Sequence, residues 1–262
     1  MIISVFHRFL HMNNNITSLP SYAQFPRIAD EMESRSAHEV LKWGIDTYGP
    51  KISLASSFGA EDVILIDMMT KIDKTKSKIF TLDTGRLNQE TYDIIDVIRK
   101  KYGIQIKVYF PKYKEVEDMV QQKGVNLMYE SLENRKLCCK IRKVDPLNRA
   151  LGDLDAWITG LRREQTVTRA KIRKIEIDSS HGSIIKINPL ADWTDKMVWE
   201  YIYKNNIPYN KLHDMGFPSI GCEPCTRAVQ QGEDPRSGRW WWENTSHKEC
   251  GLHWDPITKH KK

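Results

Sequence analysis

The chain has 262 residues, a hydrophobic fraction of 40% and a formal net charge of +6 at pH 7. These values suit one large α/β domain or two small ones, and they exclude a mainly disordered chain. No apolar run approaches the ~20 residues of a membrane-spanning helix, and the start lacks the apolar stretch and cleavage site of a signal peptide. We therefore expect a cytoplasmic protein that does not associate with membranes and whose cysteines stay reduced.

The first part of the chain alternates between strand and helix patterns. Residues 51–58 (KISLASSF) predict a buried strand. Residues 60–70 are apolar on nearly every side, which is typical of a buried helix. A second strand is expected over 77–84, followed by an amphipathic helix that ends at Gly103.

The alternation continues in the middle of the chain. Strands are expected over 104–111 and 155–162, with a helix over 113–124 between them. Residues 171–178 and 183–190 flank a short polar turn and predict a hairpin. Strands that alternate with helices pair in parallel, so the expected fold class is α/β with a doubly wound, mainly parallel sheet. Ligands of such sheets bind beyond the carboxyl ends of the strands.

We expect the chain to have three parts. Residues 1–25 form an N-terminal extension with little order, residues 26–210 a nucleotide-binding α/β domain, and residues 211–262 a C-terminal segment. The last helix of the α/β domain should begin after Thr194, whose side chain suits an N-cap. After Pro208 the composition shifts toward Gly, Pro, Trp and Cys, which marks the start of the C-terminal segment.

Three polar, glycine-containing loops follow predicted strands, and such loops meet at one edge of a parallel sheet. In the first, SSFGAED, the glycine lets the backbone approach a ligand, and the helix start offers N–H groups to an anion. This loop is neither a Walker loop nor a dinucleotide fingerprint. Together the loops predict a site for a phosphorylated ligand. Its residues are Ser56, Ser57 and Gly59 in the first loop, Thr84, Gly85 and Arg86 in the second, and Gly160, Arg162, Arg163 and Arg169 in the third.

Four of the five cysteines form two close pairs. Cys138 and Cys139 are adjacent, and Cys222 and Cys225 form a C-x-x-C arm. Adjacent cysteines rarely bridge each other, because the geometry is strained. Four thiolates bind zinc or an iron–sulfur cluster, while a redox-active C-x-x-C with an unrelated pair is a third interpretation. The cations around Cys138 and Cys139 would offset the charge of a thiolate-bound cluster, which favours the cluster over zinc.

The fifth cysteine, Cys250, stands in HKECGLHW without a sequence partner. If the other four hold one metal centre, this thiol is free, and the histidines and lysine around it favour the thiolate. Just upstream, DPRSGRWWW places Arg236 and Arg239 before three tryptophans. The alternatives are an ordinary surface cysteine and an aromatic cluster that serves only packing.

These motifs, taken together, resemble the assimilatory adenylyl-sulfate (APS) reductases of the APS/PAPS reductase family. The motifs that carry the resemblance are SSFGAED, LDTGRL, CC-x-x-R-K, GC-x-P-C-T, R-x-G-R-W-W-W and E-C-G-L-H, in chain order over roughly residues 30–255. The resemblance implies the adenine nucleotide α-hydrolase-like fold. It also implies that adenylyl sulfate and reduced thioredoxin are converted to sulfite, AMP and oxidised thioredoxin. The thioredoxin-like domain of plant members lies outside the region of resemblance.

The resemblance also implies roles for individual residues. It makes Cys250 the nucleophile and places Lys143 between the metal centre and the substrate. It assigns the phosphosulfate to Arg236 and Arg239, with His253 near it. The first loop departs from the S-G-A-E-D form often seen, because Phe58 stands where that serine would be; either Ser56 or Ser57 then contacts the ligand. The implied ligands of one [4Fe–4S] cluster per subunit are Cys138, Cys139, Cys222 and Cys225.

The implied mechanism has two steps. The thiolate of Cys250 attacks the sulfate sulfur and forms an enzyme S-sulfocysteine, with AMP as the leaving group. A thioredoxin thiolate then attacks the Cys250 sulfur and expels sulfite. The expected partners are thus adenylyl sulfate, thioredoxin or a similar thiol donor, and further copies of the chain in a homo-oligomer, with no nucleic acid.

Three other functions fit parts of the same sequence. Reduction of the 3′-phosphorylated substrate, alone or in addition, is the nearest, but relatives specific for it generally lack the four cluster cysteines. An RNA-thiolating enzyme of the same broad fold would need an S-G-G-x-D-S pyrophosphate loop, which this sequence lacks. A metal-binding regulator would leave Cys250 and the three loops without a purpose.

Overall fold

The structure is a computed structural model that describes residues 19–20 and 23–243. Its centre is a six-stranded sheet in the order β3-β2-β1-β4-β6-β5. All neighbouring strands are parallel except β5 and β6, which form an antiparallel hairpin. The predicted α/β class, the mainly parallel sheet and the hairpin are therefore confirmed. The strands are β1 (Ile52–Ala55), β2 (Ile79–Leu82), β3 (Ile106–Tyr109), β4 (Ala156–Ile158), β5 (Ile175–Asp178) and β6 (Ile184–Ile187).

Local signals in the sequence explain where several helices begin and end. The side chain of Ser36 accepts from the Glu39 backbone N–H, and Glu39 accepts in return from the Ser36 backbone, a capping box that starts α2. Gly103 ends α4 in the left-handed conformation. Thr194 caps α8 as predicted. The helices are α1 (Phe25–Glu33), α2 (Ala37–Tyr48), α3 (Ala60–Asp73), α4 (Gln89–Tyr102), α5 (Tyr113–Lys123), α6 (Leu132–Cys139), α7 (Asp145–Leu151) and α8 (Asp195–Lys204).

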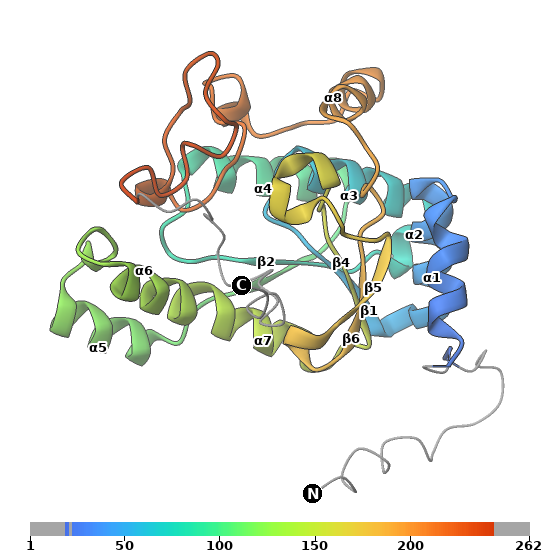
Figure 1. Cartoon of the computed structure of the whole chain (residues 1–262), viewed down its shortest axis with the longest axis horizontal. Coiled ribbons are helices and arrows are strands. Elements are labelled where there is room, and N and C mark those ends of the chain that lie inside the picture. Colours follow the sequence, from blue (N-terminus) through green and yellow to red (C-terminus); the bar gives the residue numbers. More distant parts are fainter. Residues whose placement is uncertain (1–18, 21–22, 244–262) are drawn as a thin grey trace, which may run out of the picture.

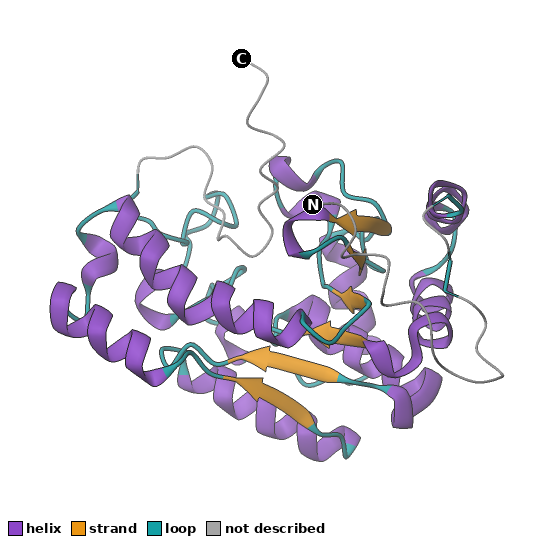
Figure 2. Ribbon diagram, turned by 90° about the horizontal axis from the view of Figure 1, so that it is seen from below, coloured by secondary structure: helices purple, strands orange, loops and turns teal. Residues whose placement is uncertain are grey.

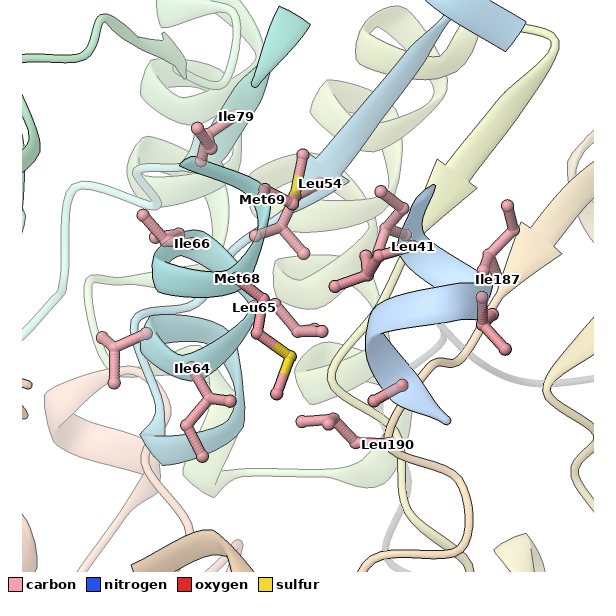
Figure 3. Packing of buried hydrophobic residues seen from close by; sticks show 14 of the residues in the cluster. Leu41, Leu54, Ile64, Leu65, Ile66, Met68, Met69, Ile79, Ile187 and Leu190 are labelled. Atoms are coloured by element: carbon pink, nitrogen blue, oxygen red, sulfur yellow. The ribbon is translucent and has the colours of Figure 1, made fainter. Parts of the chain in front are cut away.

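Helices cover both faces of the sheet (Figures 1 and 2). The main core lies on the face covered by α2, α3 and α4, with α8 packed on the outer side of α3. Figure 3 shows Leu41 of α2 and Leu65 of α3 within this core, beside Leu190. The apolar surroundings on all sides explain why the sequence of α3 shows no polar face. A smaller core, with Phe80, Leu147 and Trp157, joins α7 to the opposite face.

The chain order creates a switch point in the sheet. From β1 the chain runs outward through α3, β2 and α4 to β3, and then it returns through α5, α6 and α7 to β4 on the other side of β1. The α3 connection after β1 and the α7 connection before β4 thus cover opposite faces of the sheet, although the two strands are parallel neighbours. In open α/β sheets, ligands bind in the crevice opened by such a reversal, beyond the carboxyl ends of the strands.

Residues 211–243 contain only short 3₁₀ turns and loops, and they pack on the α/β part of the chain. The backbone N–H of Glu223 donates to the carbonyl of Arg86, and the Tyr129 hydroxyl donates to the carbonyl of Pro224. Within the described residues, no helix is both long and apolar enough to cross a membrane.

Candidate active site

A cavity of about 520 Å³ opens at the switch point, and the loops after β1, β2 and β4 line it. Residues from the C-terminal segment close its far side. The predicted substrate residues on its wall are Ser56, Ser57, Gly59, Thr84, Lys143, Gly160, Arg162, Arg236 and Arg239, and Arg169 lines it too. Arg86 lies instead at a second, smaller cavity. Gly85 lines neither cavity, and Cys250 and His253 lie outside the described residues.

The first loop is held by hydrogen bonds within its own motif. The backbone N–H and the hydroxyl of Ser57 both donate to Asp62, at 2.6 and 2.9 Å. The hydroxyl of Ser56 accepts from the backbone N–H of Phe58 at 3.1 Å. Phe58 has a φ of 60°, in the left-handed region that bulky residues avoid. Its fully buried ring, packed in the main core, holds this backbone in place.

Asp62 is buried beside the cavity, and its carboxyl is unusual. Burial raises the pKa of this carboxyl to about 7, although the two bonds from Ser57 act in the opposite direction. Gly160 packs directly against it, since a Cβ there would lie 2.5 Å from Asp62 Oδ1. The glycine of the third loop thus lets β4 approach the start of α3.

Arg162 is buried, and carboxylates surround its guanidinium. Its Nε lies 2.7 Å from Glu61, while Nη1 and Nη2 lie 3.2 Å from Glu164 and Asp195, respectively. The side chain therefore connects the starts of α3 and α8 across the cavity wall. That Arg162 contacts the substrate stays a prediction. The three carboxylates already balance the positive charge of its guanidinium at this end of the cavity.

Two other cations of the large cavity, Arg239 and Lys143, lie near the cysteines. Arg239 is buried, donates to Ser219 and to the carbonyl of Ile220, and leaves its Nε without a hydrogen-bond partner. Gly221 makes room for this guanidinium, because a Cβ at that position would overlap it. Lys143 lines both the large and the small cavity. A buried cation with an unused donor beside a cavity is suited to bind an anion.

All four paired cysteines line the small cavity, which measures about 10 Å³. Cys138 and Cys139 are the last residues of α6, while Cys222 precedes and Cys225 ends a 3₁₀ turn of the C-terminal segment. Residues 140–143 continue α6 as part of a π-helical turn, a distortion common at functional sites. This turn carries Arg142, which donates to the carbonyl of Thr84 at 2.6 Å, and Lys143.

The four thiols lie in unequal electrostatic surroundings. Burial alone would raise the pKa of the Cys222 thiol, but Lys143, the Thr84 hydroxyl and the nearby arginines hold that pKa below its ordinary value. Thr84 Oγ1 lies 3.2 Å from Cys222 Sγ, so the wall of the large cavity touches the small one. Burial raises the pKa of Cys225 to about 12, and the neighbouring Cys222 adds to the rise. Burial also raises the pKa of Cys138.

Among the described residues, no group of three or more His, Cys, Asp or Glu side chains is spaced to hold a metal ion. The donor chemistry of the small cavity nevertheless fits a thiolate-bound centre. Its described lining has four cysteines and no histidine or carboxylate, together with the cations Arg86, Arg142 and Lys143. An all-thiol donor set of this kind suits an iron–sulfur cluster or a Cys₄ zinc ion.

Several residues of the large cavity were not predicted from the sequence. Glu61 and Asp62 belong to the SSFGAED motif, so the motif itself contained the signal. His213 lines the same cavity, its buried Nε2 lacks a hydrogen-bond partner, and burial lowers its pKa. Trp157 lies in β4, just before the third loop, whereas Asp195 lies at the start of α8, far from any loop motif in the sequence, and the fold brings it to the cavity.

Comparisons with known proteins agree with this geometry. Residues 51–228 match the family described as the phosphoadenosine phosphosulfate reductase domain. The chain is 52% identical to the adenosine 5′-phosphosulfate reductase of Burkholderia cepacia, over 79% of this chain and 82% of that protein. It is 50% identical to the enzyme of the same name from Allochromatium vinosum, over 77% and 78% of the two chains.

A solved structure extends the likeness to three dimensions. The phosphoadenylyl-sulfate reductase of Candida auris, determined as a phosphate complex, superposes with a TM-score of 0.68 at 30% identity, covering 80% of this chain and 98% of that one. The fold is thus the adenine nucleotide α-hydrolase-like α/β fold that the sequence predicted. The chain belongs to the phosphoadenosine phosphosulfate reductase domain family of oxidoreductases, where it groups with the adenosine 5′-phosphosulfate reductases.

Proposed function

We propose that the chain reduces adenylyl sulfate to sulfite and AMP with a thioredoxin-type dithiol, as a step of sulfate assimilation in the cytoplasm. The names of its relatives support this substrate. The observation that carries the proposal is the position of Lys143, which lines both the nucleotide-sized cavity and the cavity of the four cysteines. A thiol-rich centre and an anion site that share one lysine suit a reductase of an anionic sulfur compound.

The large cavity suits a nucleotide with a charged tail. Its volume, about 520 Å³, lies within the range of small-ligand pockets. Phe80, Leu147 and Trp157 give part of its wall an apolar surface for a purine. We assign the phosphosulfate to the side of Lys143 and Arg239, since the carboxylates around Arg162 would repel it. Ser56 and Ser57 then lie beside the nucleotide.

The first step is a thiol attack. The thiolate of Cys250 attacks the sulfur of adenylyl sulfate, an S–S bond forms, and the S–O bond to the phosphate breaks. The electron pair of that bond leaves with AMP, and the enzyme carries Cys250–S–SO₃⁻. Thiolate and phosphosulfate are both anionic, so Arg236, Arg239 and Lys143 would offset their repulsion and stabilise the leaving phosphate.

The second step consumes the reductant. One thiolate of the dithiol attacks the Cys250 sulfur and releases sulfite, which leaves a mixed disulfide. The second thiol of the reductant resolves it, and Cys250 returns as a thiol. Two electrons pass from the dithiol, which becomes a disulfide, to the sulfur that leaves as sulfite.

We propose that Cys138, Cys139, Cys222 and Cys225 hold one [4Fe–4S] cluster. Support comes from the four thiols on one cavity and the cations around it. When bound, the cluster would supply a fixed local charge and a cross-link between α6 and the C-terminal segment, while the electrons come from the dithiol. Analysis of anaerobically purified protein should find about four iron and four sulfide per chain. Stoichiometric zinc without sulfide would refute this assignment.

One observation favours a second substrate, the 3′-phosphorylated form. The Candida auris enzyme is a phosphoadenylyl-sulfate reductase by name, and it shares the fold over most of the chain. Its identity to this chain is lower than that of the bacterial adenosine 5′-phosphosulfate reductases, so we place adenylyl sulfate first.

Anaerobic turnover tests both candidates in one experiment. The cluster-loaded protein is mixed with thioredoxin and thioredoxin reductase, and sulfite is measured with each nucleotide in turn. We expect sulfite from adenylyl sulfate at a much higher kcat/KM than from the 3′-phosphorylated form. The reverse order of kcat/KM would refute the substrate assignment. No sulfite from either nucleotide would refute the proposed reaction.

A further inference from the structure

A buried ion pair lies at the end of the described chain. Arg135 of α6 and Glu243 bond through two contacts, Nε to Oε1 at 2.7 Å and Nη2 to Oε2 at 3.1 Å. Their side chains are only 5% and 7% exposed, whereas most ion pairs of the described residues involve exposed side chains. The two residues are 108 positions apart in the sequence. The pair therefore joins α6 to the last residue that the structure describes.

Stability alone explains this pair poorly. Burying two charges costs several kcal/mol of lost hydration per ion, and apolar residues of similar volume often stabilise a protein as well or better. Two-point contacts, however, fix geometry, because the planar guanidinium and the carboxylate match in one orientation. The best-attested use of buried polar groups is to specify one arrangement among several. This pair thus fixes the position of the chain at Glu243.

Neighbouring contacts fix the same point. The guanidinium of Arg135 also lies over the ring of Trp240, 4.5 Å from its centroid, and the Glu243 backbone N–H donates to the Trp240 carbonyl at 2.9 Å. Trp240 is itself buried, and it lines the small cavity of the four cysteines. Arg135 stands three residues before Cys138 on the same helix. The chain at Glu243 is therefore fixed relative to the cysteine helix.

The position of this fixed point matters for the reaction. Cys250 follows Glu243 by seven residues, and seven residues span at most about 25 Å when extended. A nucleophile that follows closely after a fixed point of the chain reaches the substrate at a high effective concentration only if that fixed point lies near enough to the substrate site. Helix α6 leads into the turn that carries Lys143 at the large cavity. A point fixed on this helix is fixed relative to the substrate site.

We propose that Arg135 and Glu243 are a positioning pair, which anchors the C-terminal segment so that Cys250 is presented to the phosphosulfate. The inference rests on the proposed function, because it takes Cys250 as the nucleophile. Neither residue touches the substrate in this scheme. Their contribution is to the rate at which Cys250 is sulfonated, not to the affinity for the nucleotide.

The test replaces both partners at once, because loss of one would leave a buried charge unpaired. The variant Arg135→Met/Glu243→Met keeps similar buried volume without the anchor. The matched control is Arg227→Met/Glu233→Met, which removes a more exposed ion pair, 2.9 Å long, from the same C-terminal segment. Each protein is loaded with the cluster and mixed with adenylyl sulfate without thioredoxin. Mass spectrometry follows sulfonation of Cys250, and AMP affinity is measured separately.

We expect the anchor variant to sulfonate Cys250 at least about tenfold more slowly than wild type, because small displacements of reacting groups cost about that much or more. AMP affinity and the cluster absorbance should stay within twofold of wild type, and the control should match wild type throughout. A purely structural role would lower the fraction of active protein but leave the rate of the active fraction unchanged. Sulfonation at the wild-type rate in the anchor variant would overturn the inference.

A second measurement separates this inference from the proposed function. Hydrogen exchange of the backbone amides of residues 240–243 should be faster in the anchor variant than in the control, whether or not any reaction occurs. Unchanged exchange would overturn the anchor. If wild type itself forms no adduct on Cys250, the proposed function fails, and the exchange result still decides whether the pair holds the chain at Glu243.

Discussion

The sheet and the C-terminal segment are stabilised in different ways. Around α3, buried aliphatic residues from strands and helices pack into one continuous core. Residues 211–243 have no strand or long helix. A small apolar cluster that includes Cys222, Cys225 and Trp240 packs them, and directional contacts hold them further: the bridge between Thr226 and Arg239, the bond from Tyr129 to Pro224, and the pair of Arg135 with Glu243. Apolar burial is non-directional, whereas these contacts require one geometry.

This difference suggests that the sheet core serves mainly stability and the C-terminal segment mainly the reaction. The sheet core fixes the loops after β1, β2 and β4 but supplies no nucleophile. The C-terminal segment supplies two of the four paired thiols and the cations Arg236 and Arg239, and it leads to Cys250. We therefore expect substitutions in the core to change the free energy of unfolding and substitutions in the C-terminal segment to change the reaction. Four substitutions test this division, in order of decreasing effect.

The largest effect is expected at Cys250. Cys250→Ser should release essentially no sulfite, a loss of at least about 10³-fold, because no covalent intermediate forms. The variant should keep the cluster and bind adenylyl sulfate, since the residues proposed for both lie elsewhere. Intact-protein mass spectrometry of wild type with substrate alone should show a gain of ~80 Da, one SO₃ group, on Cys250.

The same experiment can contradict the assignment of Cys250. Peptide mapping locates the adduct, and added thioredoxin should remove it with release of sulfite. An adduct on Cys222 or Cys225, or none during a competent single turnover, would exclude Cys250 as the nucleophile.

A core substitution should have the opposite signature. Leu65 of α3 is fully buried, and Leu65→Ala should cost about 2–5 kcal/mol of unfolding free energy through lost burial and a cavity. Denaturant unfolding measures the loss, while kcat per folded molecule should stay near wild type. Val97→Ala, on the exposed side of α4, should cost less than about 0.5 kcal/mol. A large drop in kcat for Leu65→Ala would break the division between the two regions.

The sequence predicted the first region better than the second for the same physical reason. Periodicity and caps are local signals, so the strands, α3, and the helix ends at Gly103 and Thr194 could be predicted. The carboxylates around Arg162 come from three separate segments, and no pattern in one segment reveals them. The sequence of the third loop therefore showed its arginines but not the carboxylates that pair with Arg162.

The cysteine region shows the same limit. Pairing of the cysteines in the sequence suggested one centre, and the structure does bring all four to one cavity. The placement of Arg86 at that cavity instead of the large one follows from its bonds to Val125 and Asn126. The sequence of the π-helical turn after Cys139 does not distinguish it from an ordinary α-helix.

Arg239 tests the C-terminal segment at the level of substrate binding. Loss of one charge-assisted contact should cost about 1.5–3 kcal/mol, so Arg239→Ala should lower kcat/KM for adenylyl sulfate roughly 10- to 150-fold. Steady-state kinetics measure the change, and Arg27→Ala, at an exposed position of α1, serves as the control. An unchanged kcat/KM in Arg239→Ala would count against the phosphosulfate assignment.

The smallest effect concerns Asp62, which belongs to both regions because it is buried in the protein and lines the cavity. Burial raises the pKa of its carboxyl to about 7 in the folded state, above the ordinary value of 3.8. Between these values the folded protein binds a proton that the unfolded chain has lost. The contribution of Asp62 to the free energy of unfolding is therefore most favourable below the ordinary pKa. It falls as pH rises toward 7, with a slope of at most about 1.4 kcal/mol per pH unit.

Asp62→Asn cannot ionise and should lack this slope. From pH 5.5 to 6.5, the unfolding free energy of wild type should fall by about 1 kcal/mol relative to Asp62→Asn, as measured by urea unfolding at each pH. Asp96→Asn is the matched control, because Lys100 and Arg99 lower the pKa of the exposed Asp96, which stays ionised in both states over this range. Parallel curves for wild type and Asp62→Asn would show that Asp62 is already charged in the folded protein. The cavity wall beside Gly160 would then carry a full negative charge, and the substrate's own anionic groups would lie farther from α3.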